Sequence, residues 1–533
     1  MKKHCPIFLL FIGLLLLPLI STAQSKVNDT LLTIDNQYIK SDEFLWMFNK
    51  NSELNKIESE LDLDQYMELF VSFKLKVAEA IEQGMDTDAS FQRELRGYKT
   101  KLERNYLSDQ TISNSLLLEA YNRLQYDVKA IHVLVRLNDS VQEIAEANRL
   151  GKLLGKLPFE EMREKYHNGK TVFVENLGYF TAFNMDYDFE TVAFNTPVGS
   201  LSNPFKTKYG HHVLKVLDRV KSDGEIQVAH IMLADQPKDT IPSEKQINKL
   251  YLELLNGADF SALAKKYSDD PQSVGKGGRL NYFRRGQLAS EIFESKCLSL
   301  KEIGAFTAPF QTEFGWHIVQ LLDIKIMEPF ELAKVDLEKR IQRDGRSQKI
   351  NQAFFNKLAK LYQVTYYNPQ KDYLLKIIDK TYFDQSWQPP IDMPQDAVLF
   401  VLNGQKIYLV NFVNYLTDGK KRYDSSWSLD GMLADAFKNF VNNTMYNKYQ
   451  SELSERFPEF RFLLNEYREG LLLFDVMQQN VWSKYPDQNE DVVKFQETLE
   501  QTWVNSLKQK HKIEINTLAW DALKQELLSQ TKK

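Results

Sequence analysis

The feature that most constrains the fold of this chain is an internal repeat in its middle. Residues 128–137 read VKAIHVLVRL and residues 226–233 read IQVAHIML, so each block begins with a short apolar run that holds one histidine. Each block also ends on a matching run, TKYGHHVLKVLD at 207–218 and TEFGWHIVQLLD at 312–323. Such self-similarity indicates one structural unit copied in tandem.

The segments between these ends also correspond. In both blocks a helical pattern, a loop, a strand-like run and a second helical pattern follow in the same order. The matched runs are PFEEMREKY with DFSALAKKY (158–166 and 259–267), NLGYF with RLNYF (176–180 and 279–283), and FETVAF with FESKCL (189–194 and 293–298). We therefore expect an α+β, multidomain protein with two tandem copies of one small domain.

Mainly helical sequence flanks the repeat on both sides. At 533 residues the chain exceeds what one hydrophobic core usually serves. Before the repeat we expect a hairpin with its turn at Asn36-Gln37, then helices at 63–81 and 90–105. After it we expect one helix over 332–361, a strand at 364–367, a break at the prolines of 389–394, and a hairpin and helix over 398–416 that echo 31–48. The expected divisions are 1–23, 24–127, 128–220, 221–327 and 328–533.

The first 23 residues have the pattern of a secretory signal peptide. Lys2 and Lys3 precede an apolar run at 7–20, and small residues follow at 21–23. The run is short for a membrane span, so we expect cleavage after Ala23 and no stable membrane insertion. Cys5 precedes the apolar run, which argues against lipid attachment at that cysteine.

Composition narrows the class of protein further. Hydrophobic residues make up 43% and charged residues 26% of the chain, which is typical of a globular protein. The formal net charge is −5 and the basic residues are scattered, so we expect no nucleic-acid partner. Cys297 is the one cysteine left after cleavage, which excludes an internal disulfide. Its flanks favour a half-buried packing position on a helix over a reactive thiol.

The second repeat resembles the parvulin family of peptidyl-prolyl isomerases. The matching runs occur in family order across 226–325: HIM (230–232), KKYSDD (265–270), GKGGRL (275–280), FRRGQL (283–288), Phe293 and TEFGWHI (312–318). The resemblance implies an enzyme that rotates Xaa-Pro peptide bonds without a cofactor.

The same resemblance implies roles for individual residues of the second repeat. His230, Asp270 and His317 would be catalytic, with the histidines paired on adjacent strands and Asp270 beside the substrate carbonyl. The residues expected to bind substrate are Leu288, Phe293, Thr312 and Phe314, with Thr312 also joining the histidine network. A purely structural interpretation stands beside each: a histidine in an apolar strand can be a satisfied core residue, Asp270 can cap the turn before Pro271, and the phenylalanines can be core.

The first repeat keeps only part of this pattern. Its equivalents are His132, Met185, Phe189, Thr207, Tyr209 and His212. The loop after Tyr166 is shortened, nothing acidic aligns with Asp270, and Glu175-Asn176 replaces the glycine pair. We therefore expect a weakened copy, either an inactive scaffold or a slow enzyme.

The histidine pair His211-His212 does not predict a metal site. Adjacent strand residues point to opposite faces of a sheet, and no further ligands stand at suitable spacing. The run GKGGR (275–279) lacks the context of a phosphate-binding loop. We expect neither a metal nor a cofactor.

The order of signal, helical module, two parvulin-like blocks and helical tail resembles the SurA-type periplasmic chaperones. This implies a periplasmic isomerase and folding chaperone for exported or outer-membrane proteins, with unfolded or extended clients that contain Xaa-Pro bonds. The alternative is a non-catalytic holdase whose parvulin-like domains serve only to bind peptides.

Overall fold

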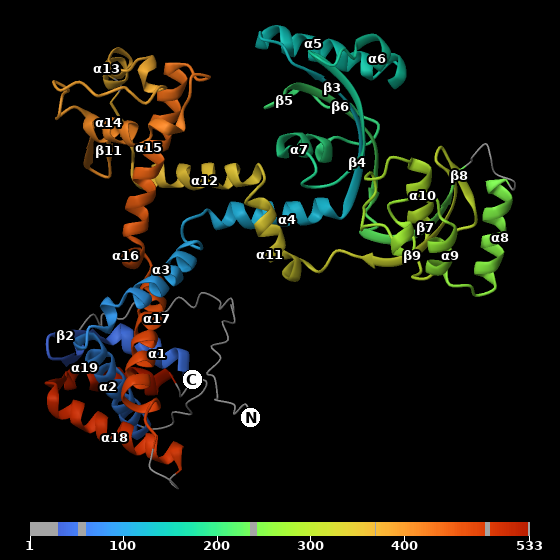
Figure 1. Cartoon of the computed structure of the whole chain (residues 1–533). Helices are drawn as coiled ribbons and strands as arrows, with labels where there is room; N and C mark the ends of the chain where they lie inside the picture. Colours follow the sequence, from blue (N-terminus) through green and yellow to red (C-terminus); the bar gives the residue numbers. More distant parts are fainter. Residues whose placement is uncertain (1–29, 52–59, 235–241, 368, 486–490, 531–533) are drawn as a thin grey trace. The chain divides into compact units, whose positions relative to one another are not determined.

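A computed structural model describes residues 30–51, 60–234, 242–367, 369–485 and 491–530 (Figure 1). The expected signal peptide lies outside these residues. The chain forms two compact units, one of residues up to 106 together with 447 onward, and one of residues 107–446. Among the described residues no helix is both long and apolar enough to cross a membrane.

The first unit is built from both ends of the chain. Strand β1 (Thr30–Ile34) pairs with β2 (Gln37–Lys40) on one side and with β13 (Ile513–Ile515) on the other, antiparallel in both cases. The helices of this unit are α1 (Ser41–Asn51), α2 (Glu60–Glu82), α3 (Ala89–Glu103), α16 (Leu453–Arg456), α17 (Pro458–Met477), α18 (Val492–Lys510) and α19 (Thr517–Gln530).

One core joins the two ends in this unit. Phe44, Leu75 and Leu523 are fully buried in the same apolar cluster, although they come from opposite ends of the sequence. The predicted hairpin is present, with its turn at Asp35-Asn36, one residue earlier than expected. The expected regions 24–127 and 328–533 therefore do not form separate bodies: each supplies residues to both units.

The second unit contains the two repeats. The first repeat forms a four-stranded antiparallel sheet in the order β4-β3-β6-β5, and the second a three-stranded sheet in the order β7-β9-β8. The strands are β3 (Tyr126–Val135), β4 (Val172–Phe180), β5 (Phe205–Thr207), β6 (Gly210–Lys221), β7 (Glu225–Leu233), β8 (Phe310–Thr312) and β9 (Gly315–Lys325). The helices of the two repeats are α5 (Ser140–Leu154), α6 (Phe159–Tyr166), α7 (Tyr187–Asn195), α8 (Ser243–Leu255), α9 (Phe260–Tyr267) and α10 (Glu291–Ser299).

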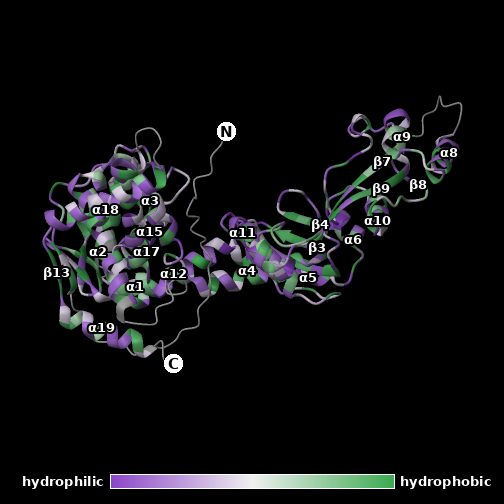
Figure 2. Cartoon of the chain, turned by 90° about the horizontal axis from the view of Figure 1, so that it is seen from below, coloured by the Kyte–Doolittle hydropathy of each residue, from purple (hydrophilic) through white to green (hydrophobic). Residues whose placement is uncertain are grey.

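Helices cover both faces of each sheet. In the first domain α5 and α6 pack on one face and α7 on the other (Figure 1). In the second, α8 and α9 cover one face and α10 the other. Because side chains alternate along a strand, His132 and His230 point to the faces that α7 and α10 cover. Hydrophobic residues run along these strands, whereas the helices mix both kinds (Figure 2).

The second domain differs from the sequence prediction at one strand. The run RLNYF was expected to pair like NLGYF, but only isolated bridges form there, Ile226 with Phe283 and Ala229 with Arg279. The long loop that precedes it, with a 3₁₀ turn at Val274–Lys276, replaces the first half of β4. Helices α5 and α8 were not predicted.

Further helices complete the second unit. They are α4 (Gln110–Leu124), α11 (Phe330–Ile341), α12 (Arg346–Leu361), α13 (Pro369–Ile377), α14 (Leu409–Asp418) and α15 (Leu429–Ser451, which runs on into the first unit). A sheet of β10 (Thr365–Tyr366), β11 (Val398–Leu402) and β12 (Gln405–Tyr408) confirms the expected hairpin and helix. The expected single helix 332–361 is wrong. It breaks between α11 and α12, where Asp344 accepts the backbone N–H of Arg346, the first residue of α12, at 3.0 Å.

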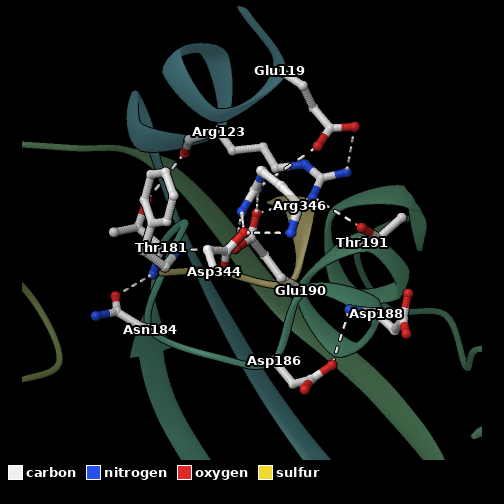
Figure 3. Close-up of polar contacts among 11 residues, drawn as sticks. Glu119, Arg123, Thr181, Asn184, Asp186, Asp188, Glu190, Thr191, Asp344 and Arg346 are labelled. Carbon is white, nitrogen blue, oxygen red and sulfur yellow. Dashed lines mark hydrogen bonds and ion pairs between the residues drawn. The ribbon is translucent and has the colours of Figure 1, made fainter. Parts of the chain in front are cut away.

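A buried ion cluster fixes α4 and α12 to the first domain (Figure 3). The carboxylate of Glu190 on α7 accepts from the guanidinium of Arg123 on α4 at 2.9 Å and from that of Arg346 on α12. Glu190 and Arg346 are fully buried. Because α7 also carries Phe189, this cluster holds one wall of the first domain's histidine site.

Candidate functional site: two histidine networks

The tight turns before β6 and β9 bring the paired histidines into position. Gly315 begins β9 with φ +131°, and a Cβ there would lie 2.2 Å from the carbonyl oxygen of Leu233 on β7. Only glycine permits so close an approach of the two strands. His317 follows two residues later, opposite Met232 in the register, and its ring stacks diagonally on that of His230. Gly210 and His212 repeat the arrangement in the first domain.

The two histidines of the second domain lie against each other at the centre of the site. The rings of His230 and His317 stack with centroids 5.9 Å apart and planes 14° apart, and both residues are buried. Their Nδ1 atoms have no hydrogen-bond partner among the described residues. The two Nε2 atoms point to opposite ends of the pair, where each meets a polar side chain.

Asp270 and Thr312 stand at those ends. The Nε2 of His230 lies 2.8 Å from Asp270 Oδ2 and 3.0 Å from Ser273 Oγ. The Nε2 of His317 lies 2.8 Å from Thr312 Oγ1, which itself accepts the backbone N–H of Phe314 at 3.1 Å. With that N–H bound to one lone pair, the Thr312 hydroxyl keeps one hydrogen and one lone pair for the contact with His317.

This arrangement fixes the proton position on the His230 ring. A carboxylate is an acceptor, so the Nε2 of His230 carries the hydrogen and its Nδ1 is unprotonated. The Thr312 hydroxyl can donate to or accept from the Nε2 of His317, so either neutral tautomer of His317 satisfies that contact. The result is a polar network with Thr312 at one end, the stacked histidines in the middle and Asp270 at the other end.

Burial keeps the two histidines uncharged at neutral pH, so the carboxylate of Asp270 is the charged group of the network. Burial, reinforced by the neighbouring His230, lowers the pKa of His317 to about 4. Burial also lowers the pKa of His230, although Asp270 partly opposes that shift. Burial alone would raise the pKa of Asp270, but hydrogen bonds from Ser273 and His230 outweigh it and lower that pKa. The site thus presents an anion beside two neutral imidazoles.

Aromatic rings wall the histidine pair. Phe293 stands edge-on to both histidines, with ring centroids 5.4 Å from His230 and 5.2 Å from His317. Phe310 stacks on His317 at 5.5 Å. Phe314, by contrast, is 55% exposed, so it lies at the rim.

Apart from Phe314 at the rim, the predicted site residues of the second domain fall into two groups. The structure brings together His230, Asp270, Phe293, Thr312 and His317. Leu288 is half-buried and packs against the core that contains Phe293. Asp270 also performs the structural role considered from the sequence, since its Oδ1 accepts the backbone N–H of Gln272 at 3.2 Å.

Sequence reasoning missed Ser273 and Phe310. Ser273 lies three residues after Asp270 in a turn, and neither its type nor its spacing marks it as a histidine partner. Phe310 does carry a signal, because it aligns with Phe205 in the first repeat. Cys297 is fully buried in α10, deeper than expected, and burial raises the pKa of its thiol.

The first domain holds a corresponding network. The rings of His132 and His212 stack at 5.5 Å, and their Nδ1 atoms lie 3.4 Å apart. Thr207 Oγ1 lies 2.8 Å from His212 Nε2 and accepts the backbone N–H of Tyr209 at 3.1 Å. Burial and the neighbouring His132 lower the pKa of His212 to about 3.

The remaining predicted residues of the first domain also lie around this pair. Phe189 stands edge-on to His132 and His212 at 5.5 and 5.4 Å. Met185 is half-buried and packs against the core that contains Phe189, and Tyr209 is 48% exposed, as Phe314 is in the second domain.

Two other features were tested as ligand sites. Glu79, Glu82 and His511 have atoms close enough to share a metal ion, but Lys510 Nζ already pairs with the two glutamates at 2.7 and 2.9 Å. A cavity of about 850 Å³ is lined by Leu118, Glu119, Arg123, Phe194 and Arg219, among others, and includes no residue of either histidine network. The chemistry therefore points to the histidine pairs.

Comparison with known proteins agrees with this geometry. A family model described as a PPIC-type PPIase domain matches residues 230–323, and a second model with the same description matches 116–220. The chain carries two parvulin domains. Its fold class is therefore α+β with tandem parvulin domains and helical flanks, as the sequence predicted.

Similar curated proteins include chaperones and a foldase. "Chaperone SurA" of Pseudoalteromonas translucida is 29% identical over 248 residues, which cover 43% of this chain and 57% of that protein. "Foldase protein PrsA 4" of Bacillus cereus is 37% identical over 119 residues, which cover 22% of this chain and 39% of that protein. The parvulin protein is thus SurA-like, but the matches span only about two fifths to three fifths of these relatives.

Two of the solved structures that match cover a fifth to a quarter of this chain. The parvulin NmPin of Nitrosopumilus maritimus is 29% identical and covers 19% of this chain and 97% of its own, with a TM-score of 0.16. PrsA of Bacillus anthracis is 31% identical and covers 25% of this chain and 60% of its own, with a TM-score of 0.18.

Proposed function

We propose that this protein is a peptidyl-prolyl cis–trans isomerase and folding chaperone for exported polypeptides, acting in the periplasm. The observation that carries the proposal is the pair of buried, neutral histidines in the second domain, held between Asp270 and Thr312 and walled by Phe293. The apolar run at 7–20 behind two lysines supports export, and the likeness to SurA chaperones supports the folding role.

The chemistry needs no nucleophile. Rotation about a prolyl peptide bond faces a barrier of about 18–20 kcal/mol because the planar amide is stabilised by conjugation. A catalyst need only bind the twisted state more tightly than either planar state. Conjugation places negative charge on the amide oxygen, and twisting removes part of it. An anion at Asp270 near that oxygen therefore disfavours the planar states more than the twisted one.

The neutral histidines keep this charge effect strong. They fill the space beneath the anion without adding a positive charge that would cancel it, and their burial keeps the local dielectric low. Phe293 and Leu288 offer an apolar surface for the proline ring, and Phe314 extends that surface at the rim. The residues that act are His230, Asp270 and His317, and those that bind are Leu288, Phe293, Thr312 and Phe314.

The test uses the chain from Gln24 onward and the rate of cis–trans conversion of a short Xaa-Pro peptide. We expect Asp270→Ala and His317→Ala to lower the contribution of the second domain by about 10²-fold, the usual effect of removing one preorganised polar group. Glu302→Ala removes an exposed carboxylate of the same domain and should leave the rate unchanged. A wild-type chain that does not accelerate the conversion would refute the enzymatic proposal.

The alternative, a non-catalytic holdase, makes a different prediction. Suppression of client aggregation would then occur in a chain without isomerase activity. If isomerisation and holding are both present, the Asp270→Ala chain should lose the second domain's share of the isomerase activity and keep the suppression of aggregation.

A further inference from the structure

The first domain has a carboxylate on its histidine, although no acidic residue aligns with Asp270. The loop between α6 and β4, residues 167–171, contains no acidic residue, whereas the longer loop after α9 in the second domain carries Asp270. Instead, Glu175 of β4 stands directly opposite His132 in the sheet register. Its Oε2 lies 2.9 Å from His132 Nε2.

The two carboxylates meet the same ring atom in the two domains. Asp270 Oδ2 lies 2.8 Å from His230 Nε2, and Glu175 Oε2 lies 2.9 Å from His132 Nε2. Burial lowers the pKa of His132, and Glu175 partly opposes that shift, as Asp270 does for His230. Because a carboxylate is an acceptor, the Nε2 of His132 carries the hydrogen, as that of His230 does. Threonine, paired histidines and carboxylate follow in the same order in both domains, although the two Nδ1 atoms are hydrogen-bonded only in the first.

The apolar wall is duplicated as well. Phe189 stands in the place of Phe293, and Phe205 stacks on His212 at 5.3 Å as Phe310 does on His317 at 5.5 Å. The first domain thus has both parts of the second domain's site: the network of threonine, histidines and carboxylate, and the aromatic wall.

The backbone explains why the carboxylate has moved. Gly278 aligns with Glu175, and His230 donates its backbone N–H to the carbonyl of Gly278 at 2.8 Å. A Cβ on Gly278 would lie 2.2 Å from the carbonyl oxygen of His230, at φ +79°. The second domain therefore has no room for a side chain there and takes its carboxylate from the loop. In the first domain β4 is a regular strand, which admits a glutamate.

We propose that the first domain holds an isomerase site of its own, in which Glu175 is the positioning residue and does for His132 what Asp270 does for His230. This rests on the proposed function of the second domain. The first domain is then an active enzyme rather than a scaffold. The side chain of Glu175 is 46% exposed against 16% for Asp270, so its charge is better screened by water and the first site is the slower of the two.

The experiment removes the site of the second domain and measures the isomerase activity that remains. In the chain carrying both Asp270→Ala and His317→Ala, we expect residual catalysis of Xaa-Pro conversion well above the uncatalysed rate. Adding Glu175→Gln should lower this remaining isomerase activity at least tenfold. The glutamine oxygen can still accept from His132 Nε2, so the ring stays in place while the charge is lost.

Two further variants separate positioning from folding. Glu175→Asp keeps the charge and should restore part of the activity, and the ¹⁵N chemical shift of His132 Nε2 should move in Glu175→Gln. Glu161→Gln removes an exposed carboxylate of α6, 38% exposed in its pair with Lys165, and should change neither readout.

The outcomes are distinguishable. If the wild-type chain is active but the Asp270→Ala, His317→Ala chain is not, the isomerase site of the first domain is refuted and the proposed function stands. If residual activity is unchanged by Glu175→Gln, the role of Glu175 is refuted. If the wild-type chain is inactive, both proposals fail.

Discussion

Glu190 is the residue whose loss should weaken the first domain most without touching its histidines. It is fully buried, and its two oxygens accept from Arg123, from Arg346 and, at 2.9 Å, from the backbone N–H of Phe183. Glutamine at this position keeps the shape but removes the charge. Its amide group also turns a donor toward one of the donors that Glu190 now satisfies.

The magnitude follows from what is left behind. Breaking a buried ion pair from one side costs about 3–5 kcal/mol, because the partner charge stays buried without compensation. Arg346 keeps Asp344, at 2.9 Å, and Arg123 keeps Glu119, at 3.1 Å, so we expect the lower end of that range. About 3 kcal/mol corresponds to an opening equilibrium shifted by roughly 10²-fold.

Hydrogen exchange measured by mass spectrometry is the suitable assay, because a chain of several domains does not unfold in one step. Peptides from α7 and α12 should lose protection by roughly 10²-fold in Glu190→Gln, while peptides from β9 should not change. Glu161→Gln, which breaks an exposed ion pair, is the control and should cost at most about 1 kcal/mol. Equal protection in the two variants would refute the reasoning.

The remaining predictions concern the second domain. His317 has a pKa of about 4 in the folded chain and of about 6.5 in the unfolded chain. Because the unfolded chain binds the proton at the higher pH, the contribution of His317 to the free energy of unfolding is fully present above pH 6.5. The free energy of unfolding should then fall by about 3 kcal/mol as the pH drops to 4. Urea unfolding followed at β9 should show this slope, and His317→Gln should lack most of it. Gly315→Ala should disrupt the β7–β9 pairing and abolish the second site, because its Cβ would meet Leu233. Gly257→Ala, also at positive φ but with open space around it, should cost only the backbone strain of about 1–2 kcal/mol, as judged by thermal unfolding.

The sequence predicted the two domains because their information is local and repeated. Each apolar strand, each helix of the repeat and each glycine before a histidine occurs twice, so one copy checks the other. The resemblance of the second repeat to parvulins indicated His230, His317, Phe293 and Thr312, and the structure brings them together from β7, β9, α10 and β8.

The features that the sequence did not predict depend on contacts between distant segments or on backbone space. Glu175 counted against the first domain because it replaced a glycine, and only the pairing of β3 with β4 shows that its carboxylate reaches His132. The break between α11 and α12 is a short polar stretch without a proline, so the sequence did not mark it as a helix end. The two ends of the chain share one core, and neither end has a sequence pattern that would predict this by itself.

That union bears on the biogenesis of the protein. Strand β1 pairs along one edge with β13, nearly the whole chain later in the sequence. Because a polypeptide is synthesised from its amino end, this edge, with its apolar residues Leu31, Leu32 and Ile34, stays open until β13 has been made. The parvulin domains, whose strands pair within their own segments, can fold meanwhile. Completion of the first unit therefore reports that the chain has been synthesised through β13, and a chain truncated before β13 would display an unsealed strand edge to proteases.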